Sequence, residues 1–149
     1  WSVDTIRRWR NGGKFDGKML TEDHKRLYDI YQKVLTLCNE EEAITKGVFF
    51  DLMYANINGW RFNERKQYTF MRKYKNELLF FVINFDSQLV DVAINIPSHA
   101  FDFLQIPQME SYQAVDLMTG AKEEISLLPY KPTDVSVGAY NGKILKITF

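Results

Sequence analysis

Cysteine is nearly absent from this sequence of 149 residues, in which Cys38 is the single example. One cysteine can form neither an intramolecular disulfide nor a thiolate zinc site, and its place on an apolar helical stripe is typical of a small core residue. Net charge is absent as well, because 19 basic residues balance 19 acidic ones. Without a basic excess, neither nucleic acid nor a membrane is expected as a partner.

Long apolar runs are also missing. None approaches the roughly 20 residues that a membrane-spanning helix needs, and no signal-peptide pattern stands at the start. The first residue is Trp1 rather than Met, so we expect a chain cut or processed from a longer protein. The localisation of that parent stays unknown, since secreted, periplasmic and cytoplasmic proteins all fit.

The sequence has no motif for a metal, a nucleotide or a nucleophile. His24 and His99 stand far apart without ligands at metal-binding spacing, and no cofactor is expected. No G-x-S-x-G element occurs. The segment "GGKFDGKM" resembles part of a phosphate-binding loop. However, Met19 replaces the hydroxyl residue that would hold Mg²⁺ and no apolar strand precedes Gly12, so we interpret it as a surface turn.

Paired carboxylates are missing too. Glycoside hydrolysis needs two of them about 5 to 10 Å apart across a cleft. The aspartates are instead scattered through turns and strand ends, where we interpret them as solvated turn residues. This chain alone is therefore not expected to be an enzyme, and its catalytic residues are predicted to be none. The aspartates concerned are Asp16, Asp51, Asp86, Asp91, Asp102 and Asp116.

The chain does contain 46% hydrophobic residues, enough for one globular core. Between residues 20 and 38 they recur at the i, i+3, i+4, i+7 spacing of one helix face. Thr21 can cap this helix, and Glu22 and Asp23 suit the positive end of its dipole. The pattern predicts an amphipathic helix that ends near Asn39.

From residue 48 onward, short β-rich segments alternate with turn residues. "YNGK" at 140–143 predicts a hairpin, "YKNE" at 74–77 predicts a second tight turn, and 97–107 is expected to hold one helical turn. About eight strands in such a series indicate a mainly β, antiparallel sandwich. The predicted strands are 48–57, 67–74, 77–85, 89–96, 111–117, 123–128, 134–140 and 143–149.

The strand at 77–85 is apolar on both faces. Side chains alternate along a strand, so Leu78, Phe80 and Val82 are expected on one face. The other face would carry Leu79, Phe81, Ile83 and Phe85. One face can line the sandwich core, and the second also needs a cover.

Aromatic residues make up 15% of the chain and can fill a core or stack on sugar rings. In "NGWRFNERKQY", residues 58–68, Trp60 stands near Arg61, Asn63 and Arg65, a composition that could stack on and hydrogen-bond a sugar. The favoured alternative is that Trp60 packs on the sandwich edge or on a missing neighbour. The carbohydrate-binding candidates are Trp60, Tyr68 and Tyr112.

Several motifs, in this order, resemble one family. "RWRNGGKFDGKMLTEDHKRLYDIYQKVLTL" looks like the end of the catalytic (β/α)₈ barrel of bacterial α-amylases, with its last loop and helix. "AITKGVF" is similar to the passage from that helix into the C-terminal domain. "YTFMRKYKNELLFFVINFD", "VDVAINIP" and "YQAVDLMTG" resemble the sandwich that follows.

The resemblance implies that residues 1–45 end a catalytic barrel and that residues 46–149 form a C-terminal Greek-key β-sandwich. The family's catalytic aspartate and glutamate residues lie on earlier barrel strands, and its calcium ligands lie in the barrel. The implied function is a non-catalytic domain that packs on and stabilises the barrel of an enzyme acting on α-glucans such as starch.

The same resemblance suggests two further partners, an α-glucan and a second copy of this chain. The alternative function is a carbohydrate-binding module that holds α-glucan on exposed aromatic residues. In the isolated chain, the surface that faces the barrel would be exposed, and self-association through it is expected. The substrate of the parent is set by barrel loops outside this sequence.

Overall fold

A computed structural model describes residues 2–149, which form two compact units, residues 2–39 and Glu40–Phe149. The first unit contains helix α1 (Val3–Arg10), the short turn η1 (Asn11–Gly13) and most of helix α2 (Glu22–Glu40). Thr21 Oγ1 accepts a hydrogen bond from the His24 amide at 3.3 Å, so it caps α2 as expected. The predicted amphipathic helix is confirmed.

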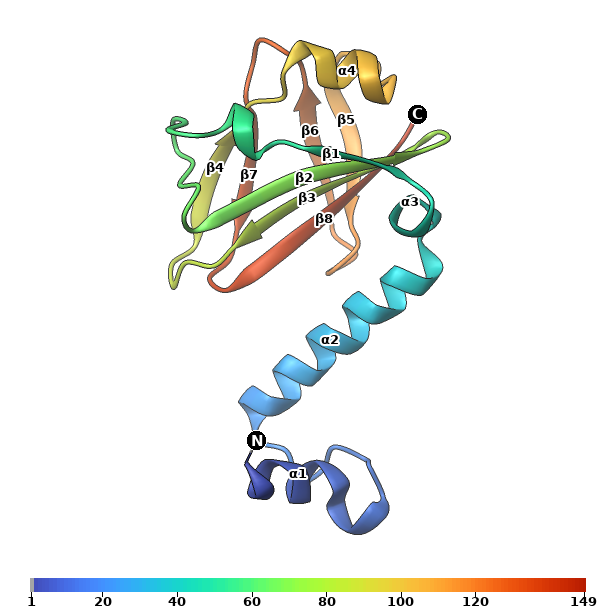
Figure 1. The fold of residues 1–149 in the computed structure, drawn as a ribbon, viewed down its shortest axis with the longest axis vertical. Helices are drawn as coiled ribbons and strands as arrows, with labels where there is room; N and C mark the ends of the chain where they lie inside the picture. The colour runs from blue at the N-terminus through green and yellow to red at the C-terminus, as the bar shows by residue number, and fades with distance from the viewer. Residues whose placement is uncertain (1) are drawn as a thin grey trace. The chain divides into compact units, whose positions relative to one another are not determined.

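The second unit is an antiparallel β-sandwich preceded by one helical turn, α3 (Glu42–Thr45) (Figure 1). Its large sheet has the strand order β1-β2-β3-β8-β5-β6, and its small sheet pairs β4 with β7. The mainly β sandwich of eight strands predicted from the sequence is confirmed. The strands are β1 (Val48–Asp51), β2 (Gln67–Tyr74), β3 (Glu77–Asn84), β4 (Val90–Ile94), β5 (Met109–Asp116), β6 (Lys122–Leu127), β7 (Thr133–Val137) and β8 (Asn141–Thr148).

The core lies between the two sheets and is closed at one end by α4 (Ser98–Leu104) (Figure 1). Leu78, Phe80 and Val82 of β3 are fully buried in it, as the alternation predicts. Helix α4 contributes Ala100, Phe101 and Leu104 to the same core. The helical turn predicted within 97–107 is therefore present and serves as the lid of the sandwich core.

The strand predicted over 48–57 is wrong in its second half. Strand β1 ends at Asp51, whose carboxylate accepts a hydrogen bond from the Met53 amide at 3.0 Å and starts the turn η2 (Met53–Ala55). The buried Asn56 side chain then donates to the Leu52 carbonyl and bonds both backbone groups of Asn95. These side-chain bonds replace a sheet ladder and turn the chain toward the end of β4.

The hairpin predicted at 140–143 is also wrong. Strand β7 pairs with β4 in the small sheet, whereas β8 runs between β3 and β5 in the large sheet. The segment between them is a crossover, held by a 2.9 Å hydrogen bond from the Tyr140 amide to the Asp86 carbonyl. The tight turn predicted at 74–77 is confirmed, because Tyr74 pairs with Glu77 across the β2–β3 hairpin.

Candidate functional site

The three aromatic residues proposed to bind sugar lie in different environments. Tyr112 is only 8% exposed, packs edge-on against Phe149, and donates its hydroxyl to the Pro107 carbonyl at 2.9 Å. Burial raises the pKa of the Tyr112 hydroxyl. Tyr112 is therefore a core residue and has no face free for a ligand.

Tyr68 lies on the face of the large sheet that points away from the core. It is 37% exposed and its ring lies 5.7 Å from that of Phe70. Phe70 in turn stacks on Phe81 at 4.2 Å and contacts Phe49 at 5.3 Å. Tyr68 thus belongs to a row of aromatic rings that crosses three strands.

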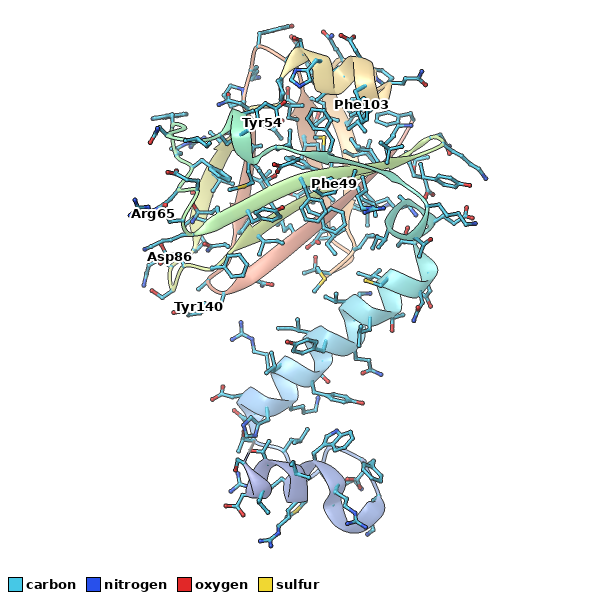
Figure 2. All side chains as sticks on the ribbon, in the orientation of Figure 1. Phe49, Tyr54, Arg65, Asp86, Phe103 and Tyr140 are labelled. Carbon is cyan, nitrogen blue, oxygen red and sulfur yellow. The ribbon has the colours of Figure 1, made fainter. Side chains whose placement is uncertain are left out.

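We call this row the outer aromatic face. Its neighbours Ile83 and Ile144 pair with Tyr68 and Phe81 across the sheet. Phe49, labelled in Figure 2, is 46% exposed and belongs to β1, the edge strand of the large sheet. Such a surface is apolar, rigid and suited to contact with another apolar surface. The outer aromatic face comprises Phe49, Tyr68, Phe70, Phe81, Ile83 and Ile144.

Trp60 is the most exposed of the three candidates, at 72%. The guanidinium of Arg61 lies over its ring, 4.3 Å from the centroid, and forms an ion pair with Asp134 of β7. The amide of Ala93 on β4 donates to the Arg61 carbonyl at 3.4 Å. The loop that carries Trp60 is therefore attached to the small sheet, away from the strands of the outer aromatic face.

A cleft of about 450 Å³ adjoins this loop. Its lining includes the apolar ring of Phe62 and the polar side chains of Asn63, Gln67, Asp86 and Asp91. Figure 2 shows Asp86 at the end of β3 where the chain turns toward β4. We name this hollow the Asp91 cleft. An exposed indole beside a polar hollow can present both stacking and hydrogen-bonding groups to a ligand.

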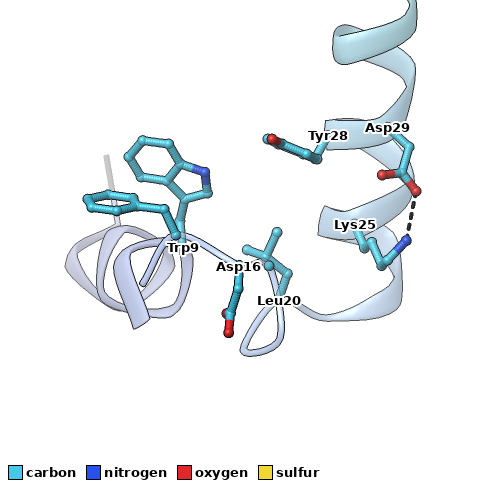
Figure 3. A pocket seen from close by; sticks show the side chains of 8 residues that line it. Trp9, Asp16, Leu20, Lys25, Tyr28 and Asp29 are labelled. Atoms are coloured by element: carbon cyan, nitrogen blue, oxygen red, sulfur yellow. Dashed lines mark hydrogen bonds and ion pairs between the residues drawn. The ribbon is translucent and has the colours of Figure 1, made fainter. Parts of the chain in front are cut away.

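The first unit has a smaller hollow of about 200 Å³ between its two helices (Figure 3). Trp9, Leu20 and Tyr28 point into it, and the Lys25 ammonium pairs with Asp29 at 2.9 Å on its rim. Lys25 and Asp29 therefore already pair within helix α2. The nearby "GGKFDGKM" segment follows helix α1 rather than a β-strand, in agreement with its interpretation as a turn.

The carboxylates of Asp16 and Asp116 accept hydrogen bonds within their own turns. Asp16 accepts from the Asn11 side chain at 2.7 Å and from the Lys18 amide at 3.1 Å, and these bonds lower the pKa of Asp16. Asp116 was expected to be a solvated turn residue, but it is 2% exposed. It accepts from the amides of Met118 and Ile144 and from the Thr119 hydroxyl. It therefore holds the β5–β6 turn against β8.

No group of three or more His, Cys, Asp or Glu residues that could hold a metal ion is found among residues 2–149. His99 lies in the first turn of α4, where its Nε2 is 2.6 Å from the Tyr54 hydroxyl oxygen. His24 lies on α2, in the other unit. Within the part of the chain that is described, no helix is long and apolar enough to cross a membrane.

Comparison by sequence finds no matching family model and no matching curated protein. Comparison by structure finds matches among glycoside hydrolases. One is a maltogenic α-amylase from Thermotoga neapolitana, with a TM-score of 0.63 and 10% identity over 87% of this chain and 27% of that one. Another is an α-amylase from Geobacillus thermoleovorans, solved with acarbose, with a TM-score of 0.58 and 15% identity over 91% and 26%.

A third match is the trehalose-6-phosphate hydrolase of Bacillus licheniformis, with a TM-score of 0.50 and 19% identity over 80% of this chain and 18% of that one. The chain thus has the fold of one part of these enzymes and spans about a quarter or less of their length. Since these enzymes are named for different substrates, the shared fold does not by itself indicate what is hydrolysed.

Proposed function

We propose that this chain is the C-terminal region of a glycoside hydrolase of the α-amylase family, in which residues 1–45 end the catalytic barrel and residues 46–149 form a non-catalytic domain that packs against it. The observation that carries the proposal is the structural match of most of this chain to about a quarter of α-amylase chains. The sequence resemblance supports the same assignment through motifs along nearly the whole chain.

The exposed apolar surface of each unit supports docking. In the sandwich, the outer aromatic face leaves Phe49 and Tyr68 partly exposed. In the first unit, helix α2 exposes Leu27, Tyr31 and Leu35. Each surface would gain on the order of 25 cal/mol for every Å² of apolar area removed from water. A catalytic barrel that covers both surfaces would provide the apolar contacts that these exposed side chains lack.

The docking role is tested by placing a charge on the outer aromatic face in two contexts. Phe49→Asp is made in the full-length parent and in the isolated chain 1–149, and thermal unfolding is followed in both. If Phe49 is buried against the barrel, the variant destabilises the parent by about 2 kcal/mol or more, because a buried aromatic contact is lost and a charge is desolvated. The isolated chain, in which this ring is half exposed, changes much less.

The matched control is Tyr130→Asp, at a tyrosine that is 77% exposed in the turn between β6 and β7. This substitution is expected to leave both proteins unchanged. Equal effects of Phe49→Asp in the parent and in the isolated chain would contradict docking through this face.

A second function, α-glucan binding, is supported by the exposure of Trp60. Tyr68 also remains a stacking candidate, although a docked barrel would compete for its ring. Native affinity electrophoresis in gels with and without soluble starch tests this function. Retardation by starch that is lost in Trp60→Ala supports binding at Trp60, whereas loss in Tyr68→Ala alone would move the site to the outer aromatic face. Unchanged mobility of the wild-type chain would remove this function.

A further inference from the structure

We infer that Trp60 and the Asp91 cleft together form one binding site for a neutral gluco-oligosaccharide, with the indole as the stacking surface and the cleft as the hydrogen-bonding half. The α-linked glucose class rests on the proposed function. The site itself rests on the arrangement of the loop, the ring and the cleft, and it gives Asp86 and Asp91 a role that the sequence did not indicate.

The loop at residues 58–66 is fixed before any ligand arrives. Asn63 accepts hydrogen bonds at its carbonyl from the amides of Lys66 and Gln67, at 2.9 and 2.7 Å. The Gln67 side chain accepts in return from the Asn63 amide at 2.7 Å and donates to Asn84 at 3.1 Å. A rigid loop loses little conformational entropy on binding, so a weak stacking contact can contribute to affinity.

The same loop sets the orientation of the indole. Arg61 adopts a positive φ of 53°, its guanidinium covers one face of Trp60, and Asp134 holds that guanidinium by an ion pair. With one face covered and 72% of the residue exposed, the indole presents its other face to solvent. An aromatic face of this kind packs well on the apolar C–H face of a hexose.

The cleft supplies the groups that recognise hydroxyls. Asp86 accepts from the Lys66 ammonium at 2.8 Å and retains further acceptor positions, as each carboxylate has about four. Asp91 forms no ion pair with any residue that the structure describes. Sugar hydroxyls can donate to both carboxylates and accept from the side-chain amide of Asn63, so the cleft matches a ligand rich in hydroxyl groups.

The charges at this site argue against an anionic ligand. Three carboxylates, those of Asp86, Asp91 and Asp134, face two cations, Arg61 and Lys66, both already paired. A phosphate or a sugar acid would meet the unpaired carboxylate of Asp91. The cleft volume of about 450 Å³ lies in the range typical of small-molecule sites, which is roughly 300 to 1,000 Å³. A neutral oligosaccharide is therefore the ligand class that fits.

The test is titration of the isolated chain with maltoheptaose, followed by calorimetry and by amide chemical shifts. Trp60→Ala is expected to weaken binding about tenfold or more, and Asp91→Ala about five- to tenfold, since each removes one half of the site. Tyr130→Ala is the control, an exposed tyrosine outside the site, and leaves affinity unchanged. Unfolding curves of each variant establish that the fold is retained.

The outcomes separate this inference from the docking role. Shifts confined to residues 59–67 and 86–92 support the site. Absence of binding at the highest soluble maltoheptaose concentration overturns it, as does binding that survives both substitutions. Equal affinity for a cello-oligosaccharide overturns the assignment to α-glucan. None of these outcomes depends on Phe49, so failure of the docking proposal in the parent enzyme would leave the titration result unaffected.

Discussion

At the scale of single residues, buried polar side chains determine where the strands of the sandwich end. Asn84 at the end of β3 is 1% exposed and uses its whole side chain. Its amide donates to the carbonyls of Gln88 and Gly138, and its oxygen accepts from Gln67 and from the Asp86 amide. One residue therefore ties the β3–β4 turn to the crossover that precedes β8.

Asn84→Ala is expected to destabilise the chain by about 2 to 4 kcal/mol, because one buried and three partly buried hydrogen-bonding groups lose their partner. Urea unfolding followed by circular dichroism measures this loss. Gln113→Ala, at an exposed residue of β5, is the control and should change stability by less than about 0.5 kcal/mol. A loss for Asn84→Ala as small as that of the control would show that water replaces the missing amide.

The ion pair of Asp86 with Lys66 predicts a pH dependence. The hydrogen bond from Lys66 is the main cause that lowers the pKa of Asp86 below its ordinary value of 3.8. A carboxyl group with a lowered folded-state pKa stabilises the fold above its unfolded-state pKa, and this contribution is lost as the pH falls through the folded-state pKa. The Lys66 contribution should therefore be full near neutral pH and vanish in acid below the ordinary value.

Comparison of wild type with Lys66→Met by thermal unfolding from pH 7 to pH 2 measures this effect. The variant should be less stable at neutral pH and converge with wild type at the acid end. Lys131→Met, at an exposed lysine in the turn before β7, is the control and should show a pH-independent offset. A constant difference between Lys66→Met and wild type across the whole range would contradict the assignment.

At the scale of elements, helix α3 is joined to β2 by one arginine. The Arg72 side chain donates to the carbonyl of Ala43 at 3.0 Å and to that of Gly47 at 2.7 Å. Gly47 is required here because a Cβ at this position would collide with the Ala43 carbonyl oxygen. The Ala-Ile-x-x-Gly sequence at this passage thus has a physical reason, since the turn into β1 leaves no room for a side chain.

Arg72→Lys keeps the charge but cannot reach both carbonyls with the planar geometry of a guanidinium. We expect it to cost about 1 to 2 kcal/mol, because hydrogen bonds from a charged donor to a partly buried turn are lost. Amide hydrogen exchange should rise at residues 42–47 and stay unchanged in β5 and β6. Faster exchange over the whole sandwich would mean that Arg72 supports the global fold instead of this turn.

At the scale of the whole molecule, both units expose large apolar side chains in groups, which a domain that folds alone usually buries. Helix α2 has a single buried residue, Leu37, although its sequence is strongly amphipathic. A helix of this pattern normally packs its apolar stripe on a neighbour. The exposed stripe and the outer aromatic face fit a chain whose packing partner lies in another part of the same protein.

The isolated chain is therefore expected to self-associate at micromolar concentration through these apolar surfaces. Sedimentation velocity over a concentration series measures this. Phe49→Asp should reduce the association, whereas Tyr130→Asp, remote from the outer aromatic face, should not. A chain that stays monomeric throughout the series would mean that the exposed rings are too dispersed to bind a second copy.

The sequence by itself determined most of the elements of the sandwich and the long helix, because hydrophobic periodicity and turn residues act over a few neighbouring positions. It predicted the long helix, the number of strands, the β2–β3 turn and the inward face of Leu78, Phe80 and Val82. It also named Trp60 as a stacking candidate but favoured packing of this ring on the sandwich edge or on a missing neighbour, whereas the ring is 72% exposed. These properties depend on the spacing of apolar side chains along one strand or helix, which is the same whatever the neighbouring elements are.

Only the tertiary structure decided which strands pair and which aromatic rings are exposed. The Asn-Gly signal at 141–142 predicted a hairpin, but β8 pairs with β3 and β5, since long-range burial outweighs local turn preference. Tyr112 was a stacking candidate because it is aromatic, but its side chain lies in the core. The Asp91 cleft joins side chains from two loops, from β2 of the large sheet and from β4 of the small sheet, so no spacing in the sequence could have assembled it.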